Sequence, residues 1–222
     1  MKKLKYWRLP YEFSFTTLRK KALVTGGSKG TGAAVVRALH EVGAEVMTAA
    51  RHPVRDLPQN VHFIEADLTT AKGCSELVQA VQKHWGKIDI VVHVLGGSSA
   101  PAGGFAVLGD EEWEREINLN LMPAIRLDRA LIPLMLEQGS GVIIHVTSIQ
   151  RELPLPESTT AYAAAKAAYL HIVKVYLKRF LQREYVLFAL RRDGLKPKLL
   201  WLWQSVLHSK QKQIMKVGSK SL

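Results

Sequence analysis

The sequence predicts an α/β fold in which helices cover both faces of a parallel sheet. Between residues 21 and 170, short apolar segments alternate with segments of helical periodicity. The short segments are almost continuously apolar, which is typical of parallel strands buried on both sides. The alternation indicates repeated β-α-β units. With 222 residues and 47% apolar residues, the chain is large enough for one domain with extensions.

The expected elements follow one another with short connections. Strands are expected at 21–26, 44–50, 61–68, 87–97 and 141–149. Helices are expected at 31–43, 74–85 and 110–136, and a further helix begins at 158. Gly43 follows the first helix as a C-cap signal. We therefore divide the chain into a basic extension (1–20), a dinucleotide-binding domain (21–170) and an atypical basic tail (171–222).

The net charge of +12 is distributed unevenly along the chain. Residues 1–21 carry +6, residues 22–170 carry −4 and residues 171–222 carry +10. A nucleic-acid-binding domain would concentrate its positive charge on a folded face. Here the excess lies on the two flanks, so nucleic acid is a disfavoured partner.

Cys74 is the only cysteine of the chain. It excludes an internal disulfide and a thiolate-rich metal site, and it is typical of a reducing compartment. No apolar run reaches the roughly 18 residues that span a bilayer, and the N-terminus lacks a secretory h-region. We expect a cytoplasmic protein without a metal and without a membrane partner.

A glycine-rich segment, Thr25–Gly32, joins the first strand to the first helix. Glycines there permit a tight turn and allow backbone N–H groups to approach a pyrophosphate at the helix N-terminus. The alternative is a glycine-rich turn without a ligand. The position of the segment in a β-α-β series favours dinucleotide binding and a Rossmann-like, doubly wound sheet.

The T-G-x-x-x-G-x-G spacing of this segment resembles the short-chain dehydrogenase/reductase family, over about residues 20–170. Thr31 departs from the isoleucine that the family often has there. The resemblance implies an oxidoreductase that uses a nicotinamide cofactor and a small-molecule carbonyl or alcohol substrate. The loop residues that it implies in cofactor binding are Gly26, Ser28, Lys29, Gly30, Thr31 and Gly32.

The end of the second strand bears on the choice of cofactor. An acid there would bind the ribose 2′-hydroxyl of NAD and repel a 2′-phosphate. The chain instead has Ala49-Ala50-Arg51, and Arg51 can hold a phosphate in a bidentate fork. Lys29 adds positive charge nearby, although each cation alone could be an ordinary surface residue. NADP(H) is therefore favoured over NAD(H).

Three further positions resemble the cofactor site of the family. Asp67 and Leu68 match its adenine contact after the third strand, with a strand-end cap as the alternative for Asp67. Gly96 matches the glycine of the family's N-N-A-G motif, while His93 and Val94 replace both asparagines. His93 either restores a polar contact that steadies the central strand or is an ordinary strand histidine, and we assign it no catalytic role.

Tyr162 and Lys166 lie four residues apart on one helical face, where an ammonium favours the ionised form of a phenol. The pair resembles the family's Y-x-x-x-K motif, and Ser148 lies at the family's serine position. The resemblance implies that Tyr162 exchanges the substrate proton, Ser148 polarises the substrate oxygen and Lys166 holds the nicotinamide ribose. Asn120, seven residues after a tryptophan, would complete a proton relay. Asn118 is the competing candidate for that role.

The tail departs from the family pattern after residue 170. A helix, a strand and a Pro-Gly loop should follow, yet no Pro-Gly occurs there. Back-translating 171–187 and reading one base earlier permits the text SYSKSLSKEVSPKGIRV, and 191–199 permits SPGWVETEA. Our hypothesis is that the tail is a frame-shifted translation of such a sequence.

An altered tail has three expected consequences. The fifth strand becomes a sheet edge unless residues 185–190 pair with it. The family's dimer interface, which the helix carrying Tyr162 often builds, is disturbed, so a homo-oligomer is doubtful. Turnover is weak or absent. The sequence thus supports an NADP(H)-dependent oxidoreductase with impaired activity. The alternatives are an inactive nucleotide-binding relative and, third, a nucleic-acid or anionic-surface binder that uses the basic ends.

Overall fold

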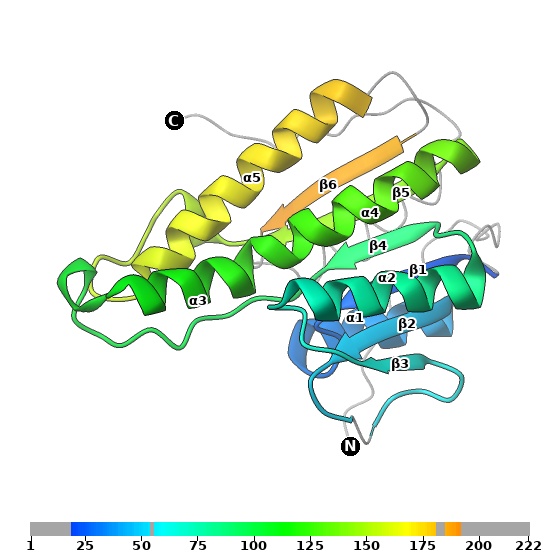
Figure 1. Cartoon of the computed structure of the whole chain (residues 1–222), viewed down its shortest axis with the longest axis horizontal. Coiled ribbons are helices and arrows are strands. Elements are labelled where there is room, and N and C mark those ends of the chain that lie inside the picture. The colour runs from blue at the N-terminus through cyan, green and yellow to red at the C-terminus, as the bar shows by residue number, and fades with distance from the viewer. Residues whose placement is uncertain (1–18, 54–55, 181–184, 192–222) are drawn as a thin grey trace, which may run out of the picture.

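A computed structural model describes residues 19–53, 56–180 and 185–191, with side chains as far as residue 176 (Figure 1). The extension before residue 19, and with it nearly all of the first basic flank, lies outside the described residues. The same is true of tail residues 192–222. No helix among the described residues is long and apolar enough to cross a membrane.

A parallel sheet forms the centre of the molecule, in the strand order β3-β2-β1-β4-β5-β6. Its strands are β1 (Lys21–Thr25), β2 (Glu45–Ala50), β3 (His62–Glu65), β4 (Ile90–His93), β5 (Gly141–Thr147) and β6 (Tyr185–Arg191). The chain builds outward from β1 to β3 and then returns to the other side of β1. In open α/β sheets, ligands bind at the carboxyl ends of the strands where the order reverses in this way. The end of β1 next to β4 is that position.

Helices cover both faces of the sheet (Figure 1). They are α1 (Gly30–Glu41), α2 (Ala71–Trp85), α3 (Asp110–Asn120), α4 (Met122–Gln138) and α5 (Thr160–Phe180), with short 3₁₀ helices at Phe105–Val107 and Ile149–Arg151. Val36 and Leu39 of α1 pack into one apolar cluster. Leu77 of α2 and Leu131 of α4 pack into a second cluster on the opposite face. The predicted two-sided α/β architecture is confirmed.

Several expected strands are shorter than predicted, and one expected helix is divided. The fourth strand ends at His93 rather than at 97, because Val94 N and Leu95 N donate to Thr25 Oγ1 at 3.2 and 3.3 Å. The expected helix 110–136 is divided at Leu121 into α3 and α4. Pro123 lacks the N–H that a continuous helix would need at that point, and it occupies the first turn of α4 instead.

The first part of the tail continues the sheet. Helix α5 runs without a break across residue 170 to Phe180. Strand β6 then pairs in parallel with β5, from Gly141 opposite Tyr185 to Thr147 opposite Arg191. Of the two outcomes expected for β5, the structure has the paired one, so β5 is not an edge strand. Because β5 leads directly to Ser148, this pairing supports the part of the sheet that carries the candidate site.

Candidate active site

The glycine loop between β1 and α1 is held close to the sheet. Gly27 N donates to Thr48 Oγ1 at 3.2 Å, and Thr48 Oγ1 donates to the Val24 carbonyl at 2.8 Å. A Cβ atom on Gly32 would overlap the carbonyl oxygen of Gly26. Only glycine therefore allows α1 to begin this close to the end of β1, as dinucleotide binding in such a loop requires.

The N-terminus of α1 has the features of a phosphate site. Its N-cap residue, Lys29, makes no side-chain capping bond, and its first turn holds no acid. In contrast, Thr70 caps α2 by accepting from Gly73 N at 3.0 Å. N–H groups at an uncapped helix start are suited to an anionic ligand, which the helix dipole also favours. The residues present therefore fit a dinucleotide pyrophosphate.

A pocket of about 150 Å³ opens beside this helix start. Its lining includes Ser28, Lys29 and Gly30 of the loop, Arg37 of α1, and Asp56 of the β2–β3 connection. The sequence analysis missed Arg37, although its spacing of seven from Gly30 indicates the same helical face. Arg51 directly follows β2 and is exposed. The pocket thus combines two cations with one acid.

The Asp67 side chain has a structural role. Its Oδ1 accepts from Thr69 N at 3.0 Å and from Thr69 Oγ1 at 2.8 Å, which closes the turn between β3 and α2. This is the capping alternative considered for Asp67, while an adenine contact by the same residue stays a prediction. Leu68 is buried in the core cluster of α2 and α4.

Tyr162 and Lys166 lie together on α5. The exposed fractions of their side chains are 6% and 3%, and Lys166 Nζ lies 5.8 Å from the centre of the Tyr162 ring. Lys166 Nζ also donates to the carbonyl of Val146 at 3.4 Å. That carbonyl belongs to the end of β5, two residues before Ser148. The expected pair therefore forms, and it is joined to the strand that leads to the expected serine.

Asn120 reaches the same place from α3. A Cβ atom on Gly96 would lie 2.9 Å from both Asn120 Oδ1 and Lys166 Nζ, so these two atoms flank the glycine. Asn120 exchanges two hydrogen bonds with Gly97: it accepts from Gly97 N at 2.9 Å and donates to Gly97 O at 2.8 Å. The competing Asn118 instead lies toward α4, where its Oδ1 is 3.4 Å from an Arg126 guanidinium nitrogen.

Ser148 begins the connection between β5 and α5 and is 3% exposed. Its Oγ accepts from Gln150 N at 3.2 Å, so the hydroxyl starts the short 3₁₀ helix that follows. The structure therefore brings together Tyr162, Lys166, Asn120 and Gly96, and it sets Ser148 at the adjoining strand end.

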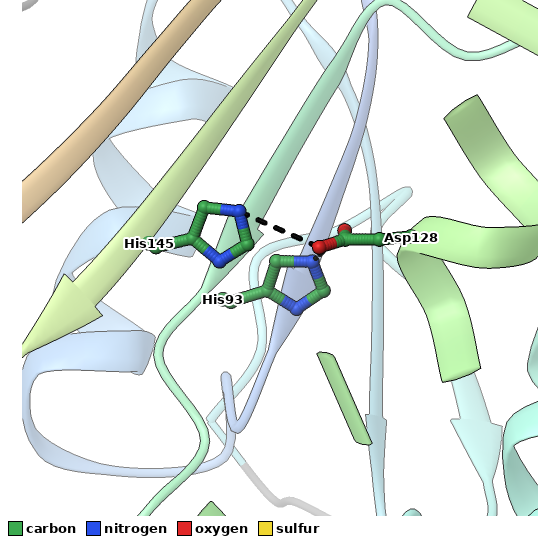
Figure 2. Close-up of side chains that lie close together, drawn as sticks. All are labelled: His93, Asp128 and His145. Carbon is green, nitrogen blue, oxygen red and sulfur yellow. Dashed lines mark hydrogen bonds and ion pairs between the residues drawn. The ribbon is translucent and has the colours of Figure 1, made fainter. Parts of the chain in front are cut away.

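A buried histidine pair lies on the neighbouring strands β4 and β5 (Figure 2). His93 of β4 and His145 of β5 occupy the same register, and their rings stack with centres 4.9 Å apart. The carboxylate of Asp128, from α4, lies 2.7 Å from His93 Nε2 and 3.5 Å from His145 Nε2. His93 thus supplies a polar contact that ties the central strand to α4. The sequence analysis missed His145, which the paired strand register could have indicated, and Asp128, which lies on α4 and has no such signal in the sequence.

The geometry of this cluster suits hydrogen bonding rather than one metal ion. The donor atoms of the three side chains lie within 4.8 Å of one another. However, the two imidazole planes differ by only 18°, so the in-plane lone pairs of the stacked rings run side by side instead of converging. His145 Nδ1 is also engaged, at 2.7 Å from the Tyr169 hydroxyl. Burial raises the pKa of Tyr169, which keeps its phenol neutral.

Comparison with known proteins agrees with the geometry. Residues 20–186 match the family model for short chain dehydrogenases. An uncharacterized oxidoreductase of Staphylococcus aureus strain MRSA252 is 33% identical over 174 residues, covering 74% of this chain and 72% of that protein. The chain therefore belongs to the short-chain dehydrogenase/reductase family of oxidoreductases and is an enzyme by ancestry.

Solved structures share the fold of this chain, and two of them were solved with different nicotinamide cofactors. The L-sorbose reductase of Gluconobacter frateurii, solved with NADPH and L-sorbose, is 28% identical with a TM-score of 0.68, covering 77% of this chain and 67% of its own. The NADH-dependent reductase A1-R′, solved with NAD, has a TM-score of 0.73 and covers 83% of each chain. At 22% identity, the second likeness shows the fold alone.

Proposed function

We propose that this protein transfers a hydride between NADP(H) and a small carbonyl or alcohol substrate. The observation that carries the proposal is the buried Tyr162–Lys166 pair, which meets Asn120 and Gly96 at the carboxyl ends of the strands beside the glycine loop. Family members with these residues are oxidoreductases. The glycine loop fits a dinucleotide, and the Tyr162–Lys166 pair fits proton exchange with a substrate.

In the proposed reaction, the reduced nicotinamide supplies the hydride that the substrate carbon receives. Tyr162 gives its phenolic proton to the carbonyl oxygen, and Ser148 donates a hydrogen bond to the same oxygen. Lys166 holds the nicotinamide ribose and stabilises the phenolate that Tyr162 becomes. Asn120 returns a proton toward Lys166. In the oxidation direction, Tyr162 accepts the alcohol proton.

The preference for NADP(H) rests on charge near the expected adenosine end. Arg51 follows β2 where NAD-dependent relatives would have an acid, and Lys29 and Arg37 line the adjoining pocket. Asp56 lines it too, but the pocket's two cations outweigh one carboxylate, and the exposed guanidinium of Arg51 at the end of β2 is suited to a 2′-phosphate. The NADPH complex of the sorbose reductase supports this choice.

We also propose that turnover is slower than in an ordinary family member. The helix and the strand that the family has after residue 170 are present, and the match to the family model extends to residue 186, but no Pro-Gly pair follows for the loop that would cover the cofactor. Strand β6 keeps the sheet complete beside β5, which supports cofactor binding. The part of the chain that would cover the substrate lacks the family's sequence. We therefore expect turnover to be weakened more than cofactor binding.

Steady-state assays at 340 nm with NADPH and a panel of ketoses, aldehydes and cyclic ketones test the function. We expect slow NADPH oxidation by the wild type and a further loss of about 100-fold or more in Tyr162→Phe, because the proton donor is removed. NADPH binding without turnover in the wild type would instead support an inactive nucleotide-binding relative. Rates typical of the family would contradict the proposed impairment.

A further inference from the structure

Glu116 is a buried carboxylate that the proposed reaction does not use. It lies on α3, whose other acidic residues are exposed or half-buried, while the exposed fraction of Glu116 is 2%. Burial of a carboxylate is costly unless its oxygens receive hydrogen bonds. The partners of Glu116 therefore indicate why a charge is present there.

Both carboxylate oxygens of Glu116 accept hydrogen bonds at the edge of the active site. Oε1 accepts from the Ser98 hydroxyl at 2.8 Å and from Ser99 N at 3.3 Å. Oε2 accepts from Asn120 Nδ2 at 2.9 Å. Ser98 and Ser99 are exposed and belong to the connection after β4, directly beyond Gly96 and Gly97. One buried group thus joins this connection to the candidate relay asparagine.

The contact with Glu116 also fixes which way the amide of Asn120 points. With Nδ2 directed at Glu116 and at the Gly97 carbonyl, Oδ1 faces Gly97 N and the space beside Lys166 Nζ. A rotated amide would direct Nδ2 at the Gly97 N–H and Oδ1 at three acceptors: the carbonyls of Gly97 and Glu116 and the Glu116 carboxylate. Together with the backbone of Gly97 and the carbonyl of Glu116, the Glu116 carboxylate therefore holds the oxygen of Asn120 on the side of Lys166.

Resting on the function proposed above, we propose that Glu116 is a positioning residue for hydride transfer, acting through Asn120 and the Ser98–Ser99 connection. Its charge is essential to this role, because three donors converge on it. A glutamine has one acceptor oxygen and one NH₂ group. Whichever way its amide turns, an N–H group faces either Asn120 Nδ2 or Ser99 N.

Glu116→Gln therefore tests the role without a change in side-chain size. The matched control is Glu114→Gln, which removes the same charge from the exposed face of the same helix. We expect Glu116→Gln to lower kcat at least about tenfold, as for one lost hydrogen bond to a charged group. The dissociation constant for NADPH should stay close to that of the wild type, because the phosphate-binding residues are untouched. Equal kinetics in the two variants would overturn the proposal.

A second measurement reads the Glu116–Asn120 contact without turnover. Asn120→Asp sets two carboxylates against each other, and adding Glu116→Gln to it supplies a donor between them. We therefore expect Glu116→Gln to lower Tm in the wild type but to raise it in the Asn120→Asp background. An equal decrease of Tm in both backgrounds would contradict the Glu116–Asn120 hydrogen bond. Absence of wild-type turnover would overturn the proposed function, whereas the Tm comparison would still decide whether Glu116 positions Asn120.

Discussion

Acid should destabilise this protein through one residue, His145. Its side chain is fully buried, and burial lowers its pKa from the usual 6.5 to about 3. The Asp128 carboxylate acts in the opposite direction, while His93 and Lys166 lower the pKa further. With its proton on Nε2, which faces Asp128, the neutral ring can accept at Nδ1 from the Tyr169 hydroxyl, and protonation would remove that acceptor.

The direction in which pH changes the free energy of unfolding follows from the lowered pKa of His145 in the folded state. Between pH 6.5 and about 3, the unfolded chain binds a proton at His145 that the folded chain does not. The free energy of unfolding is therefore highest above pH 6.5 and falls as the pH decreases through this window. The slope approaches about 1.4 kcal/mol per pH unit, which gives about 2 kcal/mol between pH 7 and pH 5.

Urea unfolding of the wild type and of His145→Asn at pH 7, 6 and 5 measures this effect. Asparagine keeps an acceptor for Tyr169 but does not titrate, so the stability of the wild type relative to the variant should decrease by about 2 kcal/mol from pH 7 to pH 5. His171→Asn, at an exposed position on α5, is the control and should show no such trend. A gap between wild type and His145→Asn that is constant with pH would refute the reasoning.

Three further predictions address the cofactor site and the tail. Arg51→Ala should raise the dissociation constant for NADPH about tenfold and leave that for NADH unchanged in fluorescence titrations, and an equal effect on both would contradict a 2′-phosphate contact. Gly32→Ala should lower the free energy of unfolding by about 1–3 kcal/mol in urea and weaken NADPH binding. Gly97→Ala, where an added Cβ meets no atom within 4 Å, should do neither, and equal losses would contradict the close approach at Gly32. Sequencing the gene should reveal family text with a Pro-Gly codon pair in the neighbouring frame of codons 171–199, and its absence there would end the frame-shift hypothesis.

Much of the fold could be predicted because it depends on local pattern. Buried parallel strands leave continuous apolar runs, and the glycine loop lies where the first run meets a helical segment. The division of the helix at Leu121 is compatible with Pro123 in the first turn of α4, but Pro133 lies inside α4 without dividing it, so the prolines alone do not predict where the helix breaks. The end of β4 at His93 could not be predicted either, because it depends on Thr25, a residue far away in the chain.

The site was predictable to the extent that a family motif marks it. Tyr162, Lys166 and Asn120 were proposed because their spacing resembles the family's motifs, and the structure brings them together at one place. Glu116 was not found, because an acid in an acidic helix gives no local sign of burial. The His93–Asp128–His145 cluster was missed for a related reason: its members come from three elements, and only the strand register aligns the two histidines.

The most direct test of the active site uses NADPH deuterated at the transferable position of nicotinamide C4. With enzyme in excess over cofactor, slow turnover does not hide the chemistry, and mass spectrometry reads the product. We predict an alcohol product one mass unit heavier, formed by the wild type and about 100-fold more slowly by Tyr162→Phe. Unlabelled product, or equal rates in the two proteins, would contradict hydride transfer at the Tyr162–Lys166 site.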